Sequence, residues 1–272
     1  MEVHTHAHSA DPGSYRGRKK WTHYFWEFLM LFLAVFCGFM AENKREKIVE
    51  QHRAKDYANS LYDDIVLDRD ELFRGINQTR FMIGAIDSLV ALSERINING
   101  SVPGLFYYYG RFATSTFRID WSKSTIDQLI QSGNLRYFRN KDLVNSINFY
   151  YYMQGIINEQ NRMDMMQRDK VMDYRNQMFQ SRYFTLFAPL DPREELKNPD
   201  HPRIDSLLRV QLPLQQGAGS LMDEFINHII ERKYRLLRIV ERYYTLADTI
   251  AMYISNELIE SYHLKKDPKQ NR

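Results

Sequence analysis

The feature of this sequence that most restricts its fold is an apolar stretch near the amino terminus. From Tyr24 to Ala41 the chain reads YFWEFLMLFLAVFCGFMA, and Glu27 is the one charged residue in it. Counted from Trp21, the stretch has about twenty residues, which extend roughly 30 Å as an α-helix. This length matches the hydrocarbon thickness of a bilayer, so the sequence predicts a transmembrane helix over residues 21–42.

Two other interpretations of the stretch are weaker. A buried core helix would account for the uncharged run from Phe28 to Ala41, but a core helix is seldom so apolar on every side. A cleaved signal peptide needs small residues at the first and third positions before the cut, and behind Ala41 the third position is Phe39. The flanking residues favour an uncleaved anchor, because basic residues and then an aromatic belt precede the apolar run. These residues are Arg16, Arg18, Lys19 and Lys20, followed by Trp21, Tyr24 and Trp26.

The numbers of basic residues before and after this helix are nearly equal, so the charges alone only weakly favour one orientation in the membrane. Four Lys or Arg residues precede it, and a second basic group follows it. A short basic leader before an uncleaved apolar helix acts as a signal-anchor, so we expect the amino terminus in the cytoplasm. The remaining chain would then be periplasmic or extracellular. The second basic group is Lys44, Arg45, Lys47, Arg53 and Lys55.

The composition limits what the rest of the chain can be. The mean hydropathy of −0.52 is polar, so membrane segments occupy only a small part of the chain. The net charge is only +3, which excludes bulk binding of nucleic acid. The one cysteine, Cys37, lies in the apolar stretch, so the remaining chain has neither a disulfide nor a thiolate metal site. Residues 1–20 form a basic leader that we expect to be disordered, and His4, His6 and His8 leave open weak binding of a transition metal.

After the apolar stretch, the hydrophobic pattern changes to amphipathic helical spacing. We expect one long stalk and bundle helix over residues 43–97, polar on nearly all sides where it begins. Asn99-Gly100 and Pro103 then break the pattern. The stretch from Leu105 to Trp121 is ambiguous between a short helix and an irregular connection. The apolar residues with helical spacing are Ala54, Ala58, Leu61, Ile65, Leu72, Ile76, Ile83, Ile86 and Val90.

Residues 98–264 are predicted to form a helical-bundle domain. Ser124 is expected to cap one helix as the first residue of a capping-box variant. Gly133 should end that helix in the left-handed conformation that favours glycine. Asn140 should cap the next helix, which is long and reaches about Ser181.

The last third of the chain contains an irregular excursion and a final long helix. Five prolines mark residues 185–219 as the excursion, with a short helix near residues 204–210. Ser220 is expected to cap the final helix, and residues 265–272 are a polar tail. Apolar residues at alternating four- and three-residue steps predict a coiled-coil heptad seam. They are Leu236, Val240, Tyr243, Ala247, Ile250 and Ile254.

These elements together predict the fold class. Long helices with antiparallel returns form a bundle of three or four helices. We therefore expect an all-α protein in which one N-terminal transmembrane helix continues into a long-helix bundle.

No recognisable catalytic motif is present. The sequence has no Gly-rich phosphate loop, no nucleophile elbow and no His-Glu-x-x-His zinc motif. Asp63-Asp64 and the run from Asp68 to Glu71 are interpreted as an acidic helix surface. Tyrosines cluster at residues 107–109, 150–152 and 243–244, where they either stack against a sugar or other ligand or line a bundle seam. We expect no enzymatic activity, no catalytic residues, no cofactor and no metal.

Glu27 is the most unusual residue, because ionisable groups inside a membrane span often mark functional sites. At 100° per residue, it shares one helix face with four other residues within about 40°. Ala34 and Gly38 on this face have the small-residue spacing that lets helices approach closely. We predict that the face contacts another helix, in a homo-oligomer or a membrane partner protein; alternatively, Glu27 extends to the lipid headgroups. The predicted contact residues are Glu27, Leu31, Ala34, Gly38 and Ala41.

Two segments of the chain carry a family resemblance. One is EFLMLFLAVFCGFMAEN, which follows the His-containing basic leader. The other is STIDQLIQSGNLRYFRNKDLVNSINFYY, in which a Thr-Ile-x-x-Leu-x-x-Ser-Gly-x-Leu turn leads into a long helix. Together they resemble the anchor and the second signature of an uncharacterised family of bacterial single-span envelope proteins. The resemblance implies a membrane-bound helical protein of unknown function, and it supplies no catalytic residues. With this resemblance, we expect the chain in the inner (cytoplasmic) membrane of a bacterium, with its C-terminal domain in the periplasm.

Three functions are compatible with these expectations. The first, which we favour, is a non-enzymatic envelope protein that serves as a scaffold or binds a partner. The second is an extracytoplasmic ligand-sensing bundle, although receptors of that layout also have a second span and a cytoplasmic output domain. The third is an accessory subunit of an ion-driven membrane complex, in which Glu27 faces a channel-forming partner.

Overall fold

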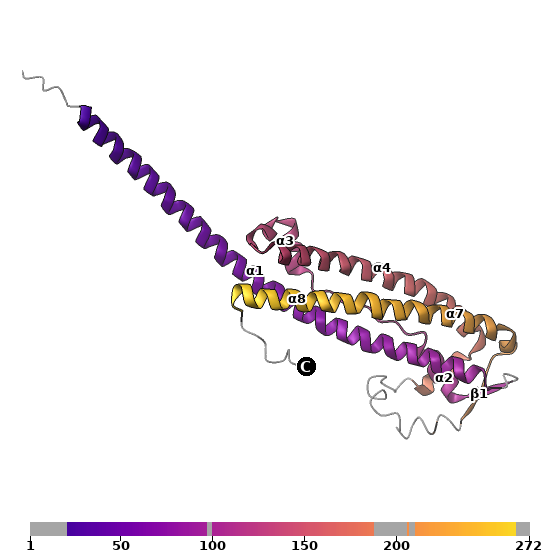
Figure 1. The fold of residues 1–272 in the computed structure, drawn as a ribbon. Helices are drawn as coiled ribbons and strands as arrows, with labels where there is room; N and C mark the ends of the chain where they lie inside the picture. The colour runs from indigo at the N-terminus through magenta and orange to yellow at the C-terminus, as the bar shows by residue number, and fades with distance from the viewer. Residues whose placement is uncertain (1–20, 97–99, 188–205, 207–209, 265–272) are drawn as a thin grey trace, which may run out of the picture. The chain divides into compact units, whose positions relative to one another are not determined.

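The computed structural model describes residues 21–96, 100–187, 206 and 210–264. The predicted leader 1–20, the polar tail 265–272 and nearly all of the short helix at 204–210 lie outside this part. The chain divides into two compact units, residues 1–53 and 54–272. The described residues are all-α apart from one small two-stranded sheet, as Figure 1 shows. The predicted fold class is therefore confirmed.

Helix α1 runs without interruption from Trp21 to Ser93. In the first unit, none of its residues is buried. In the second unit, it buries a residue every three or four positions from Ala54 to Leu89, which is the predicted amphipathic spacing. Gly75 lies on this buried face, and a Cβ atom there would stand only 3.0 Å from the ring of Phe117, so the close packing favours glycine.

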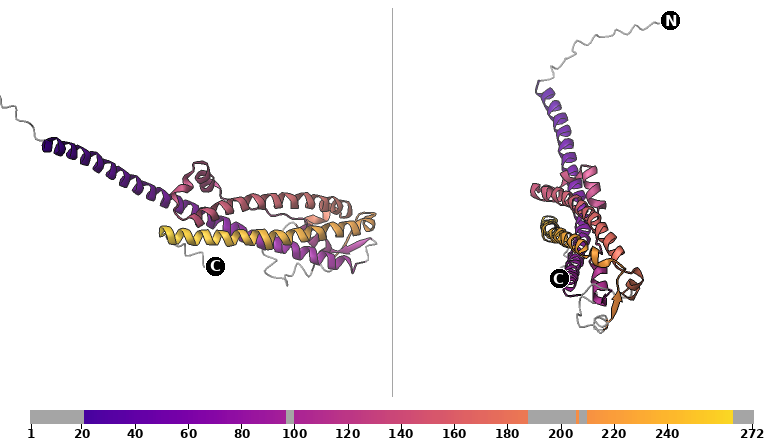
Figure 2. Two further views of the ribbon diagram at one scale, coloured as in Figure 1. Left: turned by 45° about the horizontal axis from the view of Figure 1, so that its top comes forward. Right: turned by 90° about the vertical axis from the view of Figure 1, so that its right-hand side faces the viewer.

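The second unit is built on three long helical rods, which lie side by side in Figures 1 and 2. The first is the bundle part of α1, and the second is α4, Lys141–Met178. The third is a continuous rod made of α7 (Ala218–Arg238), η3 (Ile239–Tyr244) and α8 (Thr245–Tyr262). The predicted long-helix bundle is thus present.

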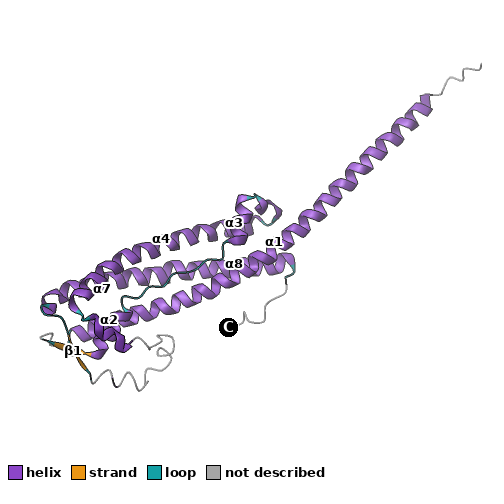
Figure 3. Cartoon of the chain, turned by 180° about the vertical axis from the view of Figure 1, so that it is seen from behind, coloured by secondary structure: helices purple, strands orange, loops and turns teal. Residues whose placement is uncertain are grey.

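The relative directions of the three long rods differ in part from the prediction. The third rod is antiparallel to α1, because Arg69 pairs with Asp248 whereas Asp87, further along α1, pairs with Lys233. Helix α4, however, runs parallel to α1. An extended crossover, residues 113–123, carries the chain back along the bundle before α4 begins, as the view from behind shows (Figure 3). The predicted antiparallel return is therefore right for α4 and the third rod, where Gln167 pairs with Glu231 and Asn161 with Tyr244, and wrong for α1 and α4.

Short elements close the two ends of the bundle. Strand β1 (Ser101–Pro103) pairs antiparallel with β2 (Gln211–Pro213), so part of the predicted irregular excursion 185–219 is a strand. Helix α2 covers Gly104–Phe112, which resolves the ambiguous stretch 105–121 into a short helix followed by the crossover. The remaining elements are α3 (Ser124–Gln131), η1 (Asn134–Tyr137) and η2 (Ser181–Phe187).

Two of the four predicted helix-end residues are confirmed. Gly133 is left-handed, with φ = 67°. Asn140 caps α4, and its side-chain oxygen accepts hydrogen bonds from the backbone N–H groups of Asp142 and Leu143 at 3.0 and 3.2 Å. These two signals depend only on residues close in sequence, which explains why the sequence reveals them.

The other two caps were wrong. The backbone N–H of Thr125 donates instead to the carboxylate of Asp64 on α1, at 3.0 Å, so a distant side chain takes the role assigned to Ser124. At the start of α7, Gly217 with φ = 82° precedes the helix. Ser220 lies inside the first turn, where its hydroxyl donates to the carbonyl of Gly217 at 2.8 Å.

The predicted heptad seam needs a correction of one residue. Helix α7 passes into α8 through the π-helical turn η3, which inserts an extra residue per turn and rotates the following face. Tyr244 is therefore buried in place of Tyr243, and Ala251 in place of Ile250. The buried series is Leu236, Val240, Tyr244, Ala247, Ala251, Ile254 and Leu258.

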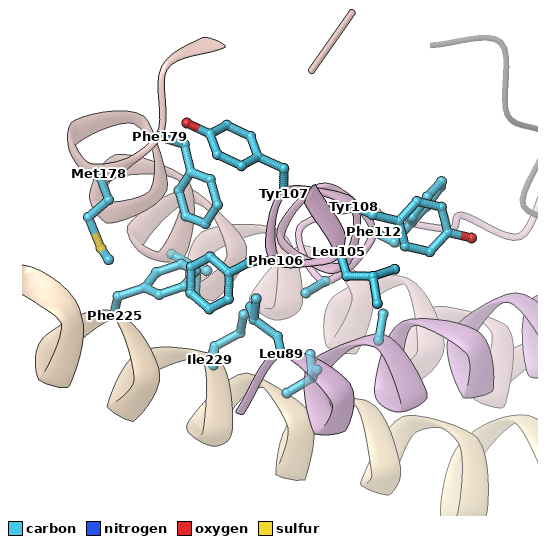
Figure 4. Close-up of a cluster of buried hydrophobic side chains, with 14 of the residues drawn as sticks. Leu89, Leu105, Phe106, Tyr107, Tyr108, Phe112, Met178, Phe179, Phe225 and Ile229 are labelled. Atoms are coloured by element: carbon cyan, nitrogen blue, oxygen red, sulfur yellow. The ribbon is translucent and has the colours of Figure 1, made fainter. Parts of the chain in front are cut away.

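An aromatic cluster packs α2 against the end of α4 and the start of α7 (Figure 4). Phe106 stacks on Phe179 with ring centroids 5.3 Å apart. The Tyr107 hydroxyl donates to the carbonyl of Pro213 at 2.6 Å and accepts from the backbone N–H of Gln180 at 3.0 Å. Of the two interpretations of this tyrosine cluster, the structure supports packing in the bundle for Tyr107 and Tyr108, which are buried, whereas Tyr109 is half-buried.

Candidate functional site

The predicted helix-contact face lies on the part of α1 in the first unit. All five residues of the face (Glu27, Leu31, Ala34, Gly38 and Ala41) are solvent-exposed. A shallow concavity on the helix is lined by His23, Trp26, Glu27, Met30, Leu31 and Ala34. A Cβ atom at Gly38 would meet nothing within 4 Å, so a facing helix backbone has room to approach. The contact itself stays a prediction.

Glu27 has a neighbour that the sequence analysis did not consider. His23 Nε2 lies 3.0 Å from Glu27 Oε1, at the i,i+4 spacing that places both side chains on one side of a helix. The imidazole supplies a local hydrogen-bond partner for the carboxyl group, which lowers the cost of placing that group at the edge of a bilayer. The pair also presents both a donor and an acceptor to any second helix.

In the second unit, buried polar side chains gather around the crossover 113–123. Residues 115–123 of this segment lie in neither a helix nor a strand, and unpaired backbone groups in an interior are costly. Arg232 of α7, which is fully buried, donates to the carbonyls of Ala113 and Ser115 at 2.5 and 2.7 Å. Asp164 of α4 neutralises the guanidinium through two hydrogen bonds of 2.9 and 2.8 Å.

Two further arginines of α4 hold the crossover at Thr114. Arg168 Nε donates to its carbonyl oxygen at 3.1 Å, and Arg175 Nη1 donates to its hydroxyl at 2.5 Å. Burial, together with the neighbouring charges of Arg168 and Arg111, lowers the pKa of Arg175 to about 10. Arg175 therefore remains charged at neutral pH and keeps its hydrogen bond.

Asp68 of α1 holds the other end of the crossover. It is only 1% exposed and accepts three hydrogen bonds: from the backbone N–H of Ser122 at 2.7 Å, the Tyr150 hydroxyl at 3.0 Å and Gln154 Nε2 at 2.9 Å. Burial raises the pKa of Asp68 to about 6, and the nearby charge of Asp64 adds to this rise, although the three hydrogen bonds oppose it. Burial and the adjacent Asp68 likewise raise the pKa of Tyr150 well above its ordinary value.

This geometry corrects the interpretation of the acidic residues as a helix surface. Asp68 is buried and Asp64 is half-buried, whereas Asp63 and Asp70 are exposed. The sequence contains a sign of this burial: Asp68 comes three residues after Ile65, at a position that helical spacing assigns to the buried face. Asp164 and Arg232 likewise occupy positions on the buried faces of their helices. A charged residue at such a position is a sign of a buried polar contact, and the sequence-based interpretation missed it.

Comparison of the chain with protein-family models, curated proteins and solved structures found no match. Its function must therefore be inferred from geometry. Within the described residues, no group of three or more His, Cys, Asp or Glu side chains is arranged to hold a metal ion. The acceptor oxygens of Asp68 are occupied by groups of the chain itself, so this carboxylate serves to position the crossover.

Proposed function

We propose that this chain is a single-pass protein of the bacterial inner membrane whose helical bundle binds a protein partner without catalysing a reaction. The apolar segment carries the proposal: α1 contains a stretch long and apolar enough to cross a membrane, and none of that stretch is buried. Phe28 is 68% exposed and Leu31 is 72% exposed. Such a continuous apolar surface is unfavourable in water and favourable in lipid.

The bundle supports a binding role through its exposed apolar side chains. Phe149, Tyr152, Met163 and Met166 of α4 are all exposed, and at 100° per residue they lie within about 100° of one another. Phe149 and Tyr152 stack with ring centroids 6.3 Å apart. Exposed aromatic and methionine side chains of this kind are enriched where proteins meet partners. The buried charged groups, by contrast, are engaged in holding the crossover.

Membrane extraction tests the anchor. We expect the full chain to stay with membranes after carbonate and high-salt washing, because residues 21–42 remain in the hydrocarbon. Deleting residues 1–42 should release the chain into the soluble fraction. Recovery of the full chain as a soluble monomer without detergent would contradict the proposal. A reporter fused at Arg272 tests the orientation that we propose, with a cytoplasmic amino terminus and a periplasmic bundle.

Cysteine crosslinking in native membranes tests the predicted helix contact. With Cys37 replaced, single cysteines are placed along residues 27–41. We expect crosslinks to peak at positions 27, 34, 38 and 41, and Gly38→Leu to weaken them, because the new side chain fills the space needed by the facing backbone. Leu29→Ala, about 160° from Glu27, should have little effect. Absence of crosslinks at every position would leave Glu27 as a headgroup-facing residue.

A second candidate is an accessory subunit of an ion-driven membrane complex, favoured by the His23–Glu27 pair. Two titratable groups within hydrogen-bond distance can exchange a proton. Glu27→Gln discriminates between the two functions. If the carboxyl group serves only as a contact, assembly and activity of the complex persist, whereas a proton-carrying role predicts that assembly persists and ion-driven activity is lost.

A further inference from the structure

A groove with a volume of about 1030 Å³ opens on the second unit, beside α1. One wall is a stripe of α1 that contains Phe81 and Gly84. The opposite wall is formed by Tyr109 of α2 and Phe117 of the crossover. The groove therefore exists only because the crossover returns along α1, and its lining includes neither Asp68 nor Arg232.

The interior of the groove is suited to a flat apolar group. Phe81, Tyr109 and Phe117 are all half-buried, so each shows part of its ring to the groove. Gly84 is exposed, and a Cβ atom added there would meet nothing within 4 Å. The absence of a side chain at Gly84 thus leaves open space between the aromatic walls.

The groove also carries an unbalanced positive charge. Its lining includes Arg74 and Arg80 and no carboxylate. Arg74 pairs with Glu71 outside the groove. Arg80 makes no hydrogen bond or ion pair with the part of the chain that the structure describes, and its side chain is exposed. An anionic group in the groove would find its counter-charge at Arg80.

We propose that this groove binds a small, water-soluble aromatic acid, with its ring system between Phe81, Tyr109 and Phe117 and its carboxylate, sulfonate or phosphate at Arg80. Pockets for small molecules typically have volumes of about 300–1,000 Å³, mostly apolar walls and a few polar groups that fix orientation. The polar rim, which includes Asn77 and Gln78, suits such a molecule better than a lipid chain. This site adds small-molecule binding to the protein-binding role proposed above and does not depend on it.

The test is calorimetric titration of the full chain, held in nanodiscs of zwitterionic lipid, with naphthalene-2-sulfonate. Empty nanodiscs provide the blank. We expect saturable binding of one probe molecule per chain. Absence of saturable heat beyond the blank would overturn the proposal.

Two glycine variants locate the site. Gly84→Leu should fill the groove and weaken binding at least about tenfold. Gly155→Leu is the matched control, because Gly155 is also an exposed glycine inside a helix whose Cβ position is open, but it lies on α4 outside the groove. Both changes favour the helix, so a loss of binding in Gly84→Leu alone cannot come from unfolding. Wild-type affinity in Gly84→Leu would place the probe elsewhere.

Two arginine variants and a neutral probe test the charge. Arg80→Gln should weaken binding of the sulfonate about tenfold, whereas Arg162→Gln, which changes an exposed arginine of α4, should leave it unchanged. Neutral 2-naphthol should bind the wild type more weakly and should be insensitive to Arg80→Gln. Equal losses for both probes in Arg80→Gln would show that Arg80 does not recognise the anion.

Discussion

Helix α1 has two regions, which differ in whether their apolar side chains are exposed or buried. From Trp21 to Arg53 no residue is buried, although large apolar side chains surround the helix. From Ala54 to Ser93 most of the apolar residues form one stripe, and that stripe is buried by the rest of the bundle. The same backbone conformation therefore carries two different kinds of surface. The amount of apolar surface decides whether a helix needs lipid, and its spacing decides which face packs on protein.

The largest expected effect comes from placing charges at exposed positions in the two regions. Phe32 and Phe36 in the apolar stretch are 52% and 47% exposed, while Leu67 and Phe73 in the bundle part are 56% and 68% exposed. Phe32→Arg with Phe36→Arg should cost about 5–7 kcal/mol of membrane insertion, since each arginine at a span centre costs about 2.5–3.5 kcal/mol. The measurement is the fraction of chain that resists carbonate extraction.

Leu67→Arg with Phe73→Arg is the control for this double variant. These two positions are just as exposed but face water, so the change should leave both extraction and helix content close to wild type. If both double variants behaved alike, the apolar stretch would not be in lipid and the comparison between the two regions would fail.

The next largest effect concerns the buried ion pair in the bundle. Arg232→Met should destabilise the chain by about 3–5 kcal/mol, because it leaves Asp164 buried without a counter-charge and two crossover carbonyls without donors. Urea denaturation of the full chain in mild detergent, followed by circular dichroism, measures this loss. Lys233→Met removes a neighbouring surface pair with Asp87 and should cost less than about 1 kcal/mol. Similar losses in the two variants would show that Arg232 does not hold the crossover.

Asp68 predicts a dependence of stability on pH. Its pKa in the folded chain is about 6, above the ordinary value of 3.8, so the folded state binds its proton more tightly than the unfolded state. This contribution is fully present below pH 3.8 and is lost as the pH rises through about 6. Relative to Asp68→Asn, the wild type should therefore lose about 2.5 kcal/mol of stability between pH 4 and pH 7. The measurement is urea denaturation of both chains across this range.

The comparison with Asp68→Asn isolates one group, because the other carboxylates are common to both chains. Exposed carboxylates such as Glu159, whose pKa is lowered by its hydrogen bond with Arg162, act in the opposite direction in both. A difference between the two chains that did not change with pH would show that Asp68 titrates normally.

The smallest expected effect comes from replacing Gly133, where backbone strain can be distinguished from a packing clash. Gly133→Val should cost about 1–2 kcal/mol, since valine disfavours the left-handed conformation at φ = 67°. Nothing lies within 4 Å of the added Cβ, so the cost cannot come from a clash with neighbours. Gly155→Val is also open but lies in an ordinary helical turn, where it should be neutral or slightly stabilising. Equal urea midpoints for the two variants would contradict the role of Gly133 at the turn.

The candidate sites were predictable to different degrees. Helical geometry alone places the five residues of the predicted helix-contact face on one side of α1, and the contact itself stays a prediction. His23, one turn before Glu27, was overlooked. Asp68 and Arg232 could have been suspected from their places among buried apolar positions. Their partners could not, because Tyr150 is 82 residues from Asp68 and Ala113 is 119 residues from Arg232. The groove beside Gly84 was likewise beyond prediction, since its walls come from three separate segments.

The sequence by itself determined the properties that depend on neighbouring residues. The apolar stretch, the long helices, the left-handed turn at Gly133 and the cap at Asn140 all follow from local composition, spacing and backbone preference. Only the tertiary structure decided the parallel course of α1 and α4, the capping of α3 by Asp64 and the π-turn that buries Tyr244. The physical reason is that each of these satisfies or packs a group from a distant segment. A backbone carbonyl in the crossover is equally polar in every sequence, and the fold alone places a buried arginine against it.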